Sequence, residues 1–105
     1  MTTKRNKEKL QPVHPGEILK EDFMDPLNLN SSQLAKALDI PANRISQILQ
    51  GKRAMTVDTA LRLNRYFKVS AEFWMNLQKN HDLEIGKDKL WQKIKHDVKP
   101  TPKVA

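Results

Sequence analysis

The chain has 105 residues, of which 38% are hydrophobic and 30% charged; it has no cysteine and a formal net charge of +7. This length suits one helical domain with tails, because two domains would each lack a sizeable core. The absence of cysteine from the sequence excludes disulfides and thiolate metal sites, and it suits the cytoplasm. Apolar runs are too short for a membrane span, and the charged N-terminus lacks the apolar stretch of a secretory signal. We therefore expect a soluble, cytoplasmic protein that does not contact membranes.

The first helix is predicted to begin at Pro15, since proline suits the first turn of a helix. Glu17 follows in the same turn, where an acidic side chain is favourable. Pro26 should end the helix, because proline cannot continue the hydrogen-bonding pattern. The apolar face of this helix consists of Ile18, Leu19, Phe23 and Met24.

Two short helices should follow, separated by the segment Asp39-Ile40-Pro41. Asn30 with Gln33 three residues later has the spacing of a capping box, and Ser31 is the alternative N-cap. The second of these helices covers Ala42–Gln50 and stops at Gly51. The inward-facing residues of the pair are Leu34, Ala35, Leu38, Ile45, Ile48 and Leu49.

Thr56 is a favourable N-cap for a fourth helix that runs to about Lys68, and Ser70 caps a fifth whose apolar pattern fades near Asn80. Beyond Gly86, apolar residues recur at helical spacing and indicate an extra C-terminal helix that would end before Pro100. No stretch alternates with period two, so the predicted fold is all-α. The predicted inward residues of the fourth and fifth helices are Val57, Ala60, Leu61, Leu63, Phe67 and Phe73.

The charges are unevenly distributed along the chain. Residues 1–9 carry a net charge of +3 and residues 87–105 a net charge of +4, so both tails are basic. Between them, Pro15–Asp25 has a net charge of −3, whereas Ser31–Arg53 has a net charge of +3. A positive segment beside a negative one orients one face of a protein toward a polyanion; the alternative is that these charges only solvate the surface.

Two short helices joined by a tight turn predict a helix-turn-helix over about Ser31 to Gln50, whose second helix would lie in the major groove of DNA. Small Ala35 would let the helices approach closely, while Ile40 and the inward-facing residues fill the space around them. The alternative is a generic helical bundle, since such bundles also have amphipathic helices. The outward face of the second helix would carry Ala42, Asn43, Arg44, Ser46, Gln47 and Gln50.

This outward face has the side chains that read bases. Asn and Gln can pair bidentately with adenine and Arg with guanine, and an alanine methyl can meet a thymine methyl. The start of the first helix of the pair favours a phosphate through its backbone N–H groups, and basic residues just past the second helix can reach flanking phosphates. The predicted base readers are Ala42, Asn43, Arg44 and Gln47, and the predicted phosphate contacts are Ser31, Ser32, Gln33, Lys52 and Arg53.

From Pro12 to about Glu84, roughly seven-tenths of its length, the chain resembles the HigA antitoxins of the Xre-like helix-turn-helix family, also called virulence-associated protein I. The resemblance lies in PVHPGEILKEDFMDPLNLN, SSQLAKALDIPANRISQILQGKRAMTVDTALRLNRYF and SAEFWMNLQ, in that order. It implies a five-helix, lambda-repressor-like domain and a homodimer. It also implies binding to double-stranded operator DNA, repression of the protein's own operon and neutralisation of a co-encoded HigB-type ribonuclease toxin.

Asp39 departs from the family, because it occupies a turn position where glycine is usual and the backbone is left-handed. Aspartate tolerates this conformation better than most residues, so the turn should persist with some strain. The expected domains are a basic tail over residues 1–11, the helix-turn-helix domain over residues 12–84 and a basic extension over residues 85–105.

Two apolar groups in the C-terminal part have alternative interpretations. Aromatic residues supply large buried areas at two-fold contacts, so Trp74, Met75 and Leu77 are candidates for the dimer interface, with core packing as the alternative for Trp74. The second group could dock a partner, touch DNA, or fold back onto the body or stay disordered; we favour the last two. Its members are Leu90, Trp91, Ile94 and Val98.

No catalytic or metal-binding pattern is evident. His14, His81 and His96 lack a paired helical spacing, so we expect capping or surface roles for them and neither a metal nor a cofactor. Nothing resembles a supported nucleophile or a phosphate-binding glycine loop. Two alternatives to the antitoxin are a stand-alone Xre-type repressor without a toxin, and a protein-interaction module without DNA binding.

Overall fold

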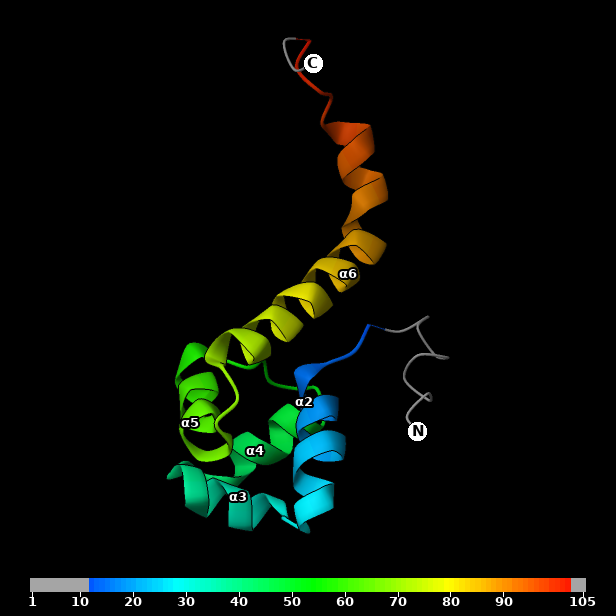
Figure 1. Cartoon of the computed structure of the whole chain (residues 1–105). Coiled ribbons are helices and arrows are strands. Elements are labelled where there is room, and N and C mark those ends of the chain that lie inside the picture. The colour runs from blue at the N-terminus through cyan, green and yellow to red at the C-terminus, as the bar shows by residue number, and fades with distance from the viewer. Residues whose placement is uncertain (1–11, 103–105) are drawn as a thin grey trace.

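The computed structural model describes residues 12–102. These residues form helices and connecting loops, and none of them belongs to a strand (Figure 1). The predicted basic tail over residues 1–11 lies outside the described residues, as do residues 103–105. The predicted all-α fold with five helical stretches is confirmed. These are α2 (Pro15–Ile18), continued by η1 (Leu19–Met24) and η2 (Asp25–Leu27), then α3 (Ser31–Leu38), α4 (Ala42–Leu49), α5 (Val57–Phe67) and α6 (Ala71–Asp97).

The first helical stretch begins at Pro15, as predicted. His14 is its N-cap, because the Gly16 N–H donates a hydrogen bond of 2.9 Å to His14 Nδ1. Pro26 does not end the helix at once: the backbone widens to π geometry in η1, tightens to 3-10 geometry in η2 and ends at Asn28. Asn28 has φ of +55°, a left-handed conformation that asparagine tolerates.

The later helices start with the predicted caps. Asn30 Oδ1 accepts a hydrogen bond from the Gln33 N–H at 2.8 Å, and Gln33 Oε1 accepts one from the Asn30 N–H at 2.9 Å. This complete capping box makes Asn30, rather than Ser31, the N-cap of α3. Thr56 and Ser70 cap α5 and α6 through their side-chain oxygens.

The core forms where α3 packs on α4 and α5, α2 packs on α4 and α6, and α5 packs on α6. Val57 and Leu61 were wrongly predicted to be buried; they are 58% and 54% exposed, because Ala60 and Leu63 occupy the inward face of α5. The buried apolar residues are Ile18, Leu19, Met24, Leu34, Ala35, Leu38, Ile45, Ile48, Met55, Ala60, Leu63 and Trp74.

Trp74 belongs to the core, which was one of its two alternatives, whereas Phe73, which was predicted to face inward, lies at the edge of the core. Trp74 is completely buried, and its ring centroid lies 5.0 Å from those of both Phe23 and Phe73, whereas Phe73 is 37% exposed. A side chain without exposed surface cannot contact a second copy, so the prediction that Trp74 lies at the dimer interface is wrong. Met75 and Leu77 are half-buried against the core, and their place at an interface stays a prediction.

α6 is one continuous helix of 27 residues, about 40 Å long. The predicted separation into a fifth helix and an extra C-terminal helix is therefore wrong. The apolar pattern fades near Asn80 because α6 leaves the core there, and the domain boundary expected between residues 84 and 85 lies inside the helix. Of the residues of α6, only Trp74 and Gln78 are fully buried.

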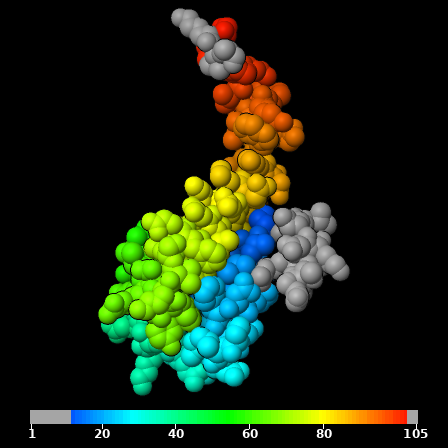
Figure 2. All heavy atoms as spheres, in the orientation of Figure 1, coloured from blue at the N-terminus to red at the C-terminus, as the bar shows by residue number. Residues whose placement is uncertain are grey.

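The second half of α6 stands clear of the body (Figures 1 and 2). Every residue from 87 to 97 is exposed, and the described chain measures 54 × 29 × 23 Å. The favoured interpretation of the C-terminal apolar residues, folding back or disorder, is therefore wrong. Among the helices of residues 12–102, none combines the length and the apolar composition of a transmembrane segment.

Candidate nucleic-acid interface

α4 is fixed in the body by its apolar side. Ile45 and Ile48 have no exposed surface, and the backbone of α2 touches that of α4 at Gly16. A Cβ atom on Gly16 would lie 2.0 Å from the Ile48 carbonyl oxygen, so only glycine fits at this crossing. The sequence analysis did not single out Gly16, because a close approach between backbones leaves no mark in hydrophobic periodicity.

The opposite side of α4 is accessible. Ala42 and Asn43 are exposed, while Arg44 and Gln47 are half-buried. All four predicted base readers thus lie on one outward face, and the predicted orientation of α4 is confirmed. Which bases they contact, and whether they do, stays a prediction.

Arg44 is held by the neighbouring helix α5. Its guanidinium donates to Asp58 Oδ2 at 3.0 Å, and Arg62 Nε donates to the same oxygen, also at 3.0 Å. The hydrogen bond from Arg62 lowers the pKa of Asp58, and the bond and charge of Arg44 act in the same direction. The Asp58 carboxylate therefore accepts hydrogen bonds from two guanidinium groups, and this contact holds the Arg44 side chain in a defined position.

Arg62 also secures the turn between α3 and α4. It donates to the Leu38 carbonyl at 2.8 Å and to the Asp39 carbonyl at 3.2 Å, where the end of a helix otherwise leaves carbonyls without partners. Asp39 has φ of +58° and ψ of +50°, the left-handed conformation predicted for it. Sequence analysis missed Arg62 and Asp58. Their spacing of four residues suggests an ion pair on one helix, but not the contact of Arg62 with a turn more than twenty residues earlier.

Gln47 and Arg53, predicted for different roles, contact each other. Arg53 Nε donates to Gln47 Oε1 at 3.0 Å. Bidentate pairing with adenine needs both the oxygen and the NH₂ group of a glutamine. Because an amide oxygen has two lone pairs, Gln47 can accept the hydrogen bond from Arg53 and still accept one from a second donor.

The predicted phosphate contacts lie at both edges of the helix pair. Ser31 is half-buried and Ser32 exposed in the first turn of α3. Gln33 uses its oxygen in the capping box, whereas a phosphate would need its NH₂ donors, so the two roles are compatible. Lys52 and Arg53 are exposed just after α4. The helix ends at Leu49, one residue before the predicted Gln50, and Gly51 follows with a left-handed φ of +76°.

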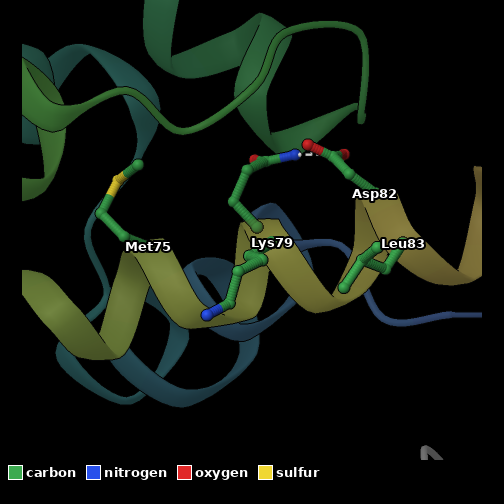
Figure 3. Close-up of a pocket in the computed structure, with 5 residues that line it drawn as sticks. Met75, Lys79, Asp82 and Leu83 are labelled. Carbon is green, nitrogen blue, oxygen red and sulfur yellow. Dashed lines mark hydrogen bonds between the residues drawn. The ribbon is translucent and has the colours of Figure 1, made fainter. Parts of the chain in front are cut away.

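A buried polar network fastens the segment after α4 to α6. The Met55 N–H donates to Gln78 Oε1 at 2.6 Å, and Gln78 Nε2 donates to Asp82 Oδ1 at 2.9 Å, the dashed line in Figure 3. Gln78 is only 6% exposed, and its burial is favourable because both ends of its amide have partners. The sequence gives no sign of the bond between Met55 and Gln78, because these two residues lie 23 positions apart.

The two histidines near this network contact each other. The rings of His14 and His81 meet edge to face, with centroids 4.9 Å apart, and His81 Nδ1 lies 3.3 Å from Asp82 Oδ1. Burial lowers the pKa of His14, and the nearby His81 lowers it further, while Asp82 opposes the shift. His14 therefore favours the neutral form, which its capping role requires; a capping role was one of the two expected for the histidines.

Comparison with known proteins shows the family to which this chain belongs. A family model described as helix-turn-helix matches residues 20–74. Virulence-associated protein I of Dichelobacter nodosus is 42% identical over 86 residues, covering 82% of this chain and 80% of the relative. Two solved structures also match. An addiction module antidote protein of the HigA family from Coxiella burnetii has a TM-score of 0.81 and 45% identity, covering 87% of this chain and 99% of that one.

The second structure is Pseudomonas aeruginosa antitoxin HigA with the higBA promoter. It has a TM-score of 0.83 and 38% identity, covering 86% of this chain and 98% of that one. The residues matched by the family model include α3, α4 and α5, the three helices that build the outward face and its supports. The chain belongs to the helix-turn-helix family that contains the HigA antitoxins and virulence-associated protein I.

Proposed function

We propose that this protein is an operator-binding antitoxin that represses its own operon and neutralises a co-encoded HigB-type ribonuclease toxin. The observation that carries the proposal is the outward face of α4, with Asn43 and Gln47 accessible and basic residues just beyond. The Pseudomonas aeruginosa relative, whose structure contains the higBA promoter, supports DNA as the ligand of this face. An autorepressor acts where the genes lie, so we also propose the cytoplasm as its location.

In this proposal α4 enters the major groove and α3 crosses the backbone. Asn43 and Gln47 read base edges, since their amides match the donor and acceptor pattern of adenine. Arg44 reaches a guanine from its position beside Asp58, and Ala42 contacts a thymine methyl. A homodimer would place two such helices in successive major grooves, about 34 Å apart, on a palindromic operator.

The phosphate contacts position the protein without reading sequence. The N-terminal turn of α3, with Ser31, Ser32 and Gln33, offers backbone N–H groups to one phosphate. Lys52 and Arg53 reach phosphates on the other side of α4. Arg53 donates to Gln47 Oε1, so in this proposal a phosphate contact and a base contact lie side by side.

The proposal is tested by measuring DNA binding of the full chain by fluorescence anisotropy at several salt concentrations. The probes are the duplex upstream of the protein's own operon and a random duplex of equal length. We expect about a thousandfold tighter binding to the operon duplex, with an affinity that falls steeply as salt rises. If the protein binds neither duplex at low salt, the DNA-binding proposal fails and the protein is an interaction module.

The antitoxin part is tested with the neighbouring reading frame. A small basic ribonuclease encoded there should arrest growth when expressed alone, and co-expression of this chain should restore growth. If no such frame exists, or if co-expression leaves growth arrested, the protein is a stand-alone repressor. Such a result would leave the DNA-binding proposal standing.

A further inference from the structure

Asp58, in the first turn of α5, lies between the proposed base reader Arg44 and the rest of the domain. Its Oδ2 atom accepts one hydrogen bond of 3.0 Å from Arg44 Nη1 and another of 3.0 Å from Arg62 Nε. The carboxylate stays on the surface, since 56% of the Asp58 side chain is exposed. An exposed ion pair contributes little to stability, so stability alone does not account for an acidic side chain beside a surface proposed to bind a polyanion.

Arg62 holds the Asp58 carboxylate in place. The two residues are four positions apart on α5, a spacing that puts them on the same face of the helix. The Arg62 guanidinium also donates to the carbonyls of Leu38 and Asp39, so it is bound at both ends. Asp58 is therefore tied to the turn between α3 and α4, and it gives the Arg44 side chain a fixed contact.

Arg44 keeps enough donors for a base while it contacts Asp58. A guanidinium group has five N–H donors, and this contact uses one of them, on Nη1. A guanine needs two donors, one for O6 and one for N7. Arg44 is the third residue of α4, and the N-terminal residues of a recognition helix are the ones that reach base edges. The contact with Asp58 is therefore compatible with a bidentate contact to guanine.

The charge of Asp58 disfavours phosphate as a partner of Arg44. Guanidinium groups bind phosphate as well as guanine, and every DNA sequence offers phosphate. A phosphate that approached Arg44 would also approach the Asp58 carboxylate, and the two like charges would repel each other. A guanine edge carries no net charge, so it meets no such repulsion. Asp58 thus favours the contact that depends on sequence over the contact that does not.

The predicted phosphate contacts after α4 have no such carboxylate. Arg53 donates to the uncharged amide of Gln47, and no ion pair within residues 12–102 involves Lys52. The acidic partner therefore lies at the arginine that is predicted to read a base, and not at the cations that are predicted to bind phosphate.

We propose that Asp58 is a specificity-determining residue, which positions Arg44 for a guanine and keeps it from phosphate. Asp58 acts through Arg44 and not on a base. The inference rests on the DNA-binding part of the proposed function and adds a residue to it. A side chain that is ordered before binding loses less conformational entropy on binding, so removal of Asp58 should reduce discrimination at the base pair read by Arg44 by about three- to tenfold.

Fluorescence anisotropy with operator duplexes that each carry one changed base pair tests the proposal on the full chain. Arg44→Ala identifies the base pair that Arg44 reads. Asp58→Ala should relax the preference at this same base pair by about three- to tenfold and leave the other positions unchanged. It should also bind random DNA more tightly, because it lacks one negative charge. The variant with both substitutions should show the same preference there as Arg44→Ala alone.

Two further variants separate orientation from charge. Asp58→Asn lacks the charge, but its amide oxygen can still accept from Arg44; it should bind random DNA as tightly as Asp58→Ala and retain more of the preference. Asp25→Ala is the matched control, since Asp25 is 53% exposed and pairs with Lys20 at 3.1 Å in another part of the domain. It removes one charge and one exposed ion pair, and it should leave the preference at every position unchanged. Circular dichroism verifies that all variants are helical.

The outcomes separate failure of this inference from failure of the proposed function. Full preference in Asp58→Ala at the base pair that Arg44→Ala relaxes overturns the inference and leaves the function standing. An even loss over all positions also overturns it, because Asp58 would then support α4 as a whole. If Arg44→Ala relaxes no position, Arg44 reads no base and the inference falls, while operator binding by the unsubstituted chain still supports the function. If the unsubstituted chain does not distinguish the operator from random DNA, the proposed function fails together with the inference.

Discussion

Asp39 shows how one residue sets the geometry between α3 and α4. Its φ of +58° is rare for residues other than glycine, asparagine and aspartate, and the carbonyls around it are bound by Arg62. We predict that Asp39→Gly is neutral or stabilising, because glycine adopts this conformation without strain. Thermal denaturation measures the effect. A clear drop in the midpoint would contradict the assignment of this turn.

His14 makes the stability of the fold depend on pH. It caps α2 through an unprotonated Nδ1, and burial followed by the nearby His81 lowers its pKa below the ordinary value of 6.5. A histidine whose pKa is lower in the folded state stabilises the fold fully above its unfolded pKa, and this contribution is lost as pH falls through its folded pKa. We expect the free energy of unfolding, measured in urea, to decline as pH is lowered from about 7.5 to about 5.

Two substitutions isolate this effect. His14→Asn keeps an oxygen acceptor at the N-cap but does not titrate, so the pH dependence should flatten. His96→Asn is the control, because His96 is exposed near the end of α6 and should leave the slope unchanged. An unaltered slope in His14→Asn would show that His14 is not the group responsible.

α2 and α4 meet at a crossing that depends on one glycine. Gly16→Ala would place a methyl group 2.0 Å from the Ile48 carbonyl oxygen, so α2 must move away from α4, which carries the proposed base readers. We predict a loss of about 1–3 kcal/mol or more in the free energy of unfolding, measured by urea denaturation. Glu17→Ala is the control on the neighbouring exposed residue and should cost less than about 1 kcal/mol. A Gly16→Ala variant as stable as the control would contradict this crossing.

Local chemistry predicts the helix starts, whereas long-range contacts decide much of the rest. The capping box at Asn30 and the caps at Thr56 and Ser70 are correct because each involves residues three apart in sequence. The continuity of α6 was missed, since a helix that leaves the core loses its apolar pattern without losing its backbone hydrogen bonds. The predicted end of the first helix at Pro26 was wrong for a related reason, because π and 3-10 turns continue the helical backbone past this residue.

The candidate site shows the same division. The amphipathic pattern of α4 was enough to place Asn43 and Gln47 outward, because burial of Ile45 and Ile48 fixes the opposite side. Its supports were not predictable. Asp58, Arg62 and Gln78 act through partners far away in sequence, and hydrophobic periodicity contains no information about such contacts. The burial of Trp74 rather than Phe73 has a similar origin, since a shift of one residue around α6 decides which ring is buried.

In residues 12–102, the proposed DNA-binding face and the exposed half of α6 lie in different parts of the molecule (Figure 1). α3 and α4 lie within the body and carry the face that we propose to read DNA, while the exposed half of α6 projects from the body (Figure 1). The hydrogen bonds of Gln78 to Met55 and Asp82 join the segment after α4 to α6, so the two parts form one connected structure. The exposed half of α6 therefore lies apart from the surface of α3 and α4 that we propose to contact DNA.

The most direct test of base reading by α4 compares Gln47→Ala with Lys52→Ala on operator DNA and on random DNA, by fluorescence anisotropy at fixed salt. Gln47→Ala should cost about 1–3 kcal/mol on the operator, relax the preference at one position per half-site and leave binding to random DNA nearly unchanged. Lys52→Ala should weaken binding to both duplexes alike, because we propose that Lys52 contacts only phosphate. Equal losses on both duplexes for Gln47→Ala would contradict base reading by α4.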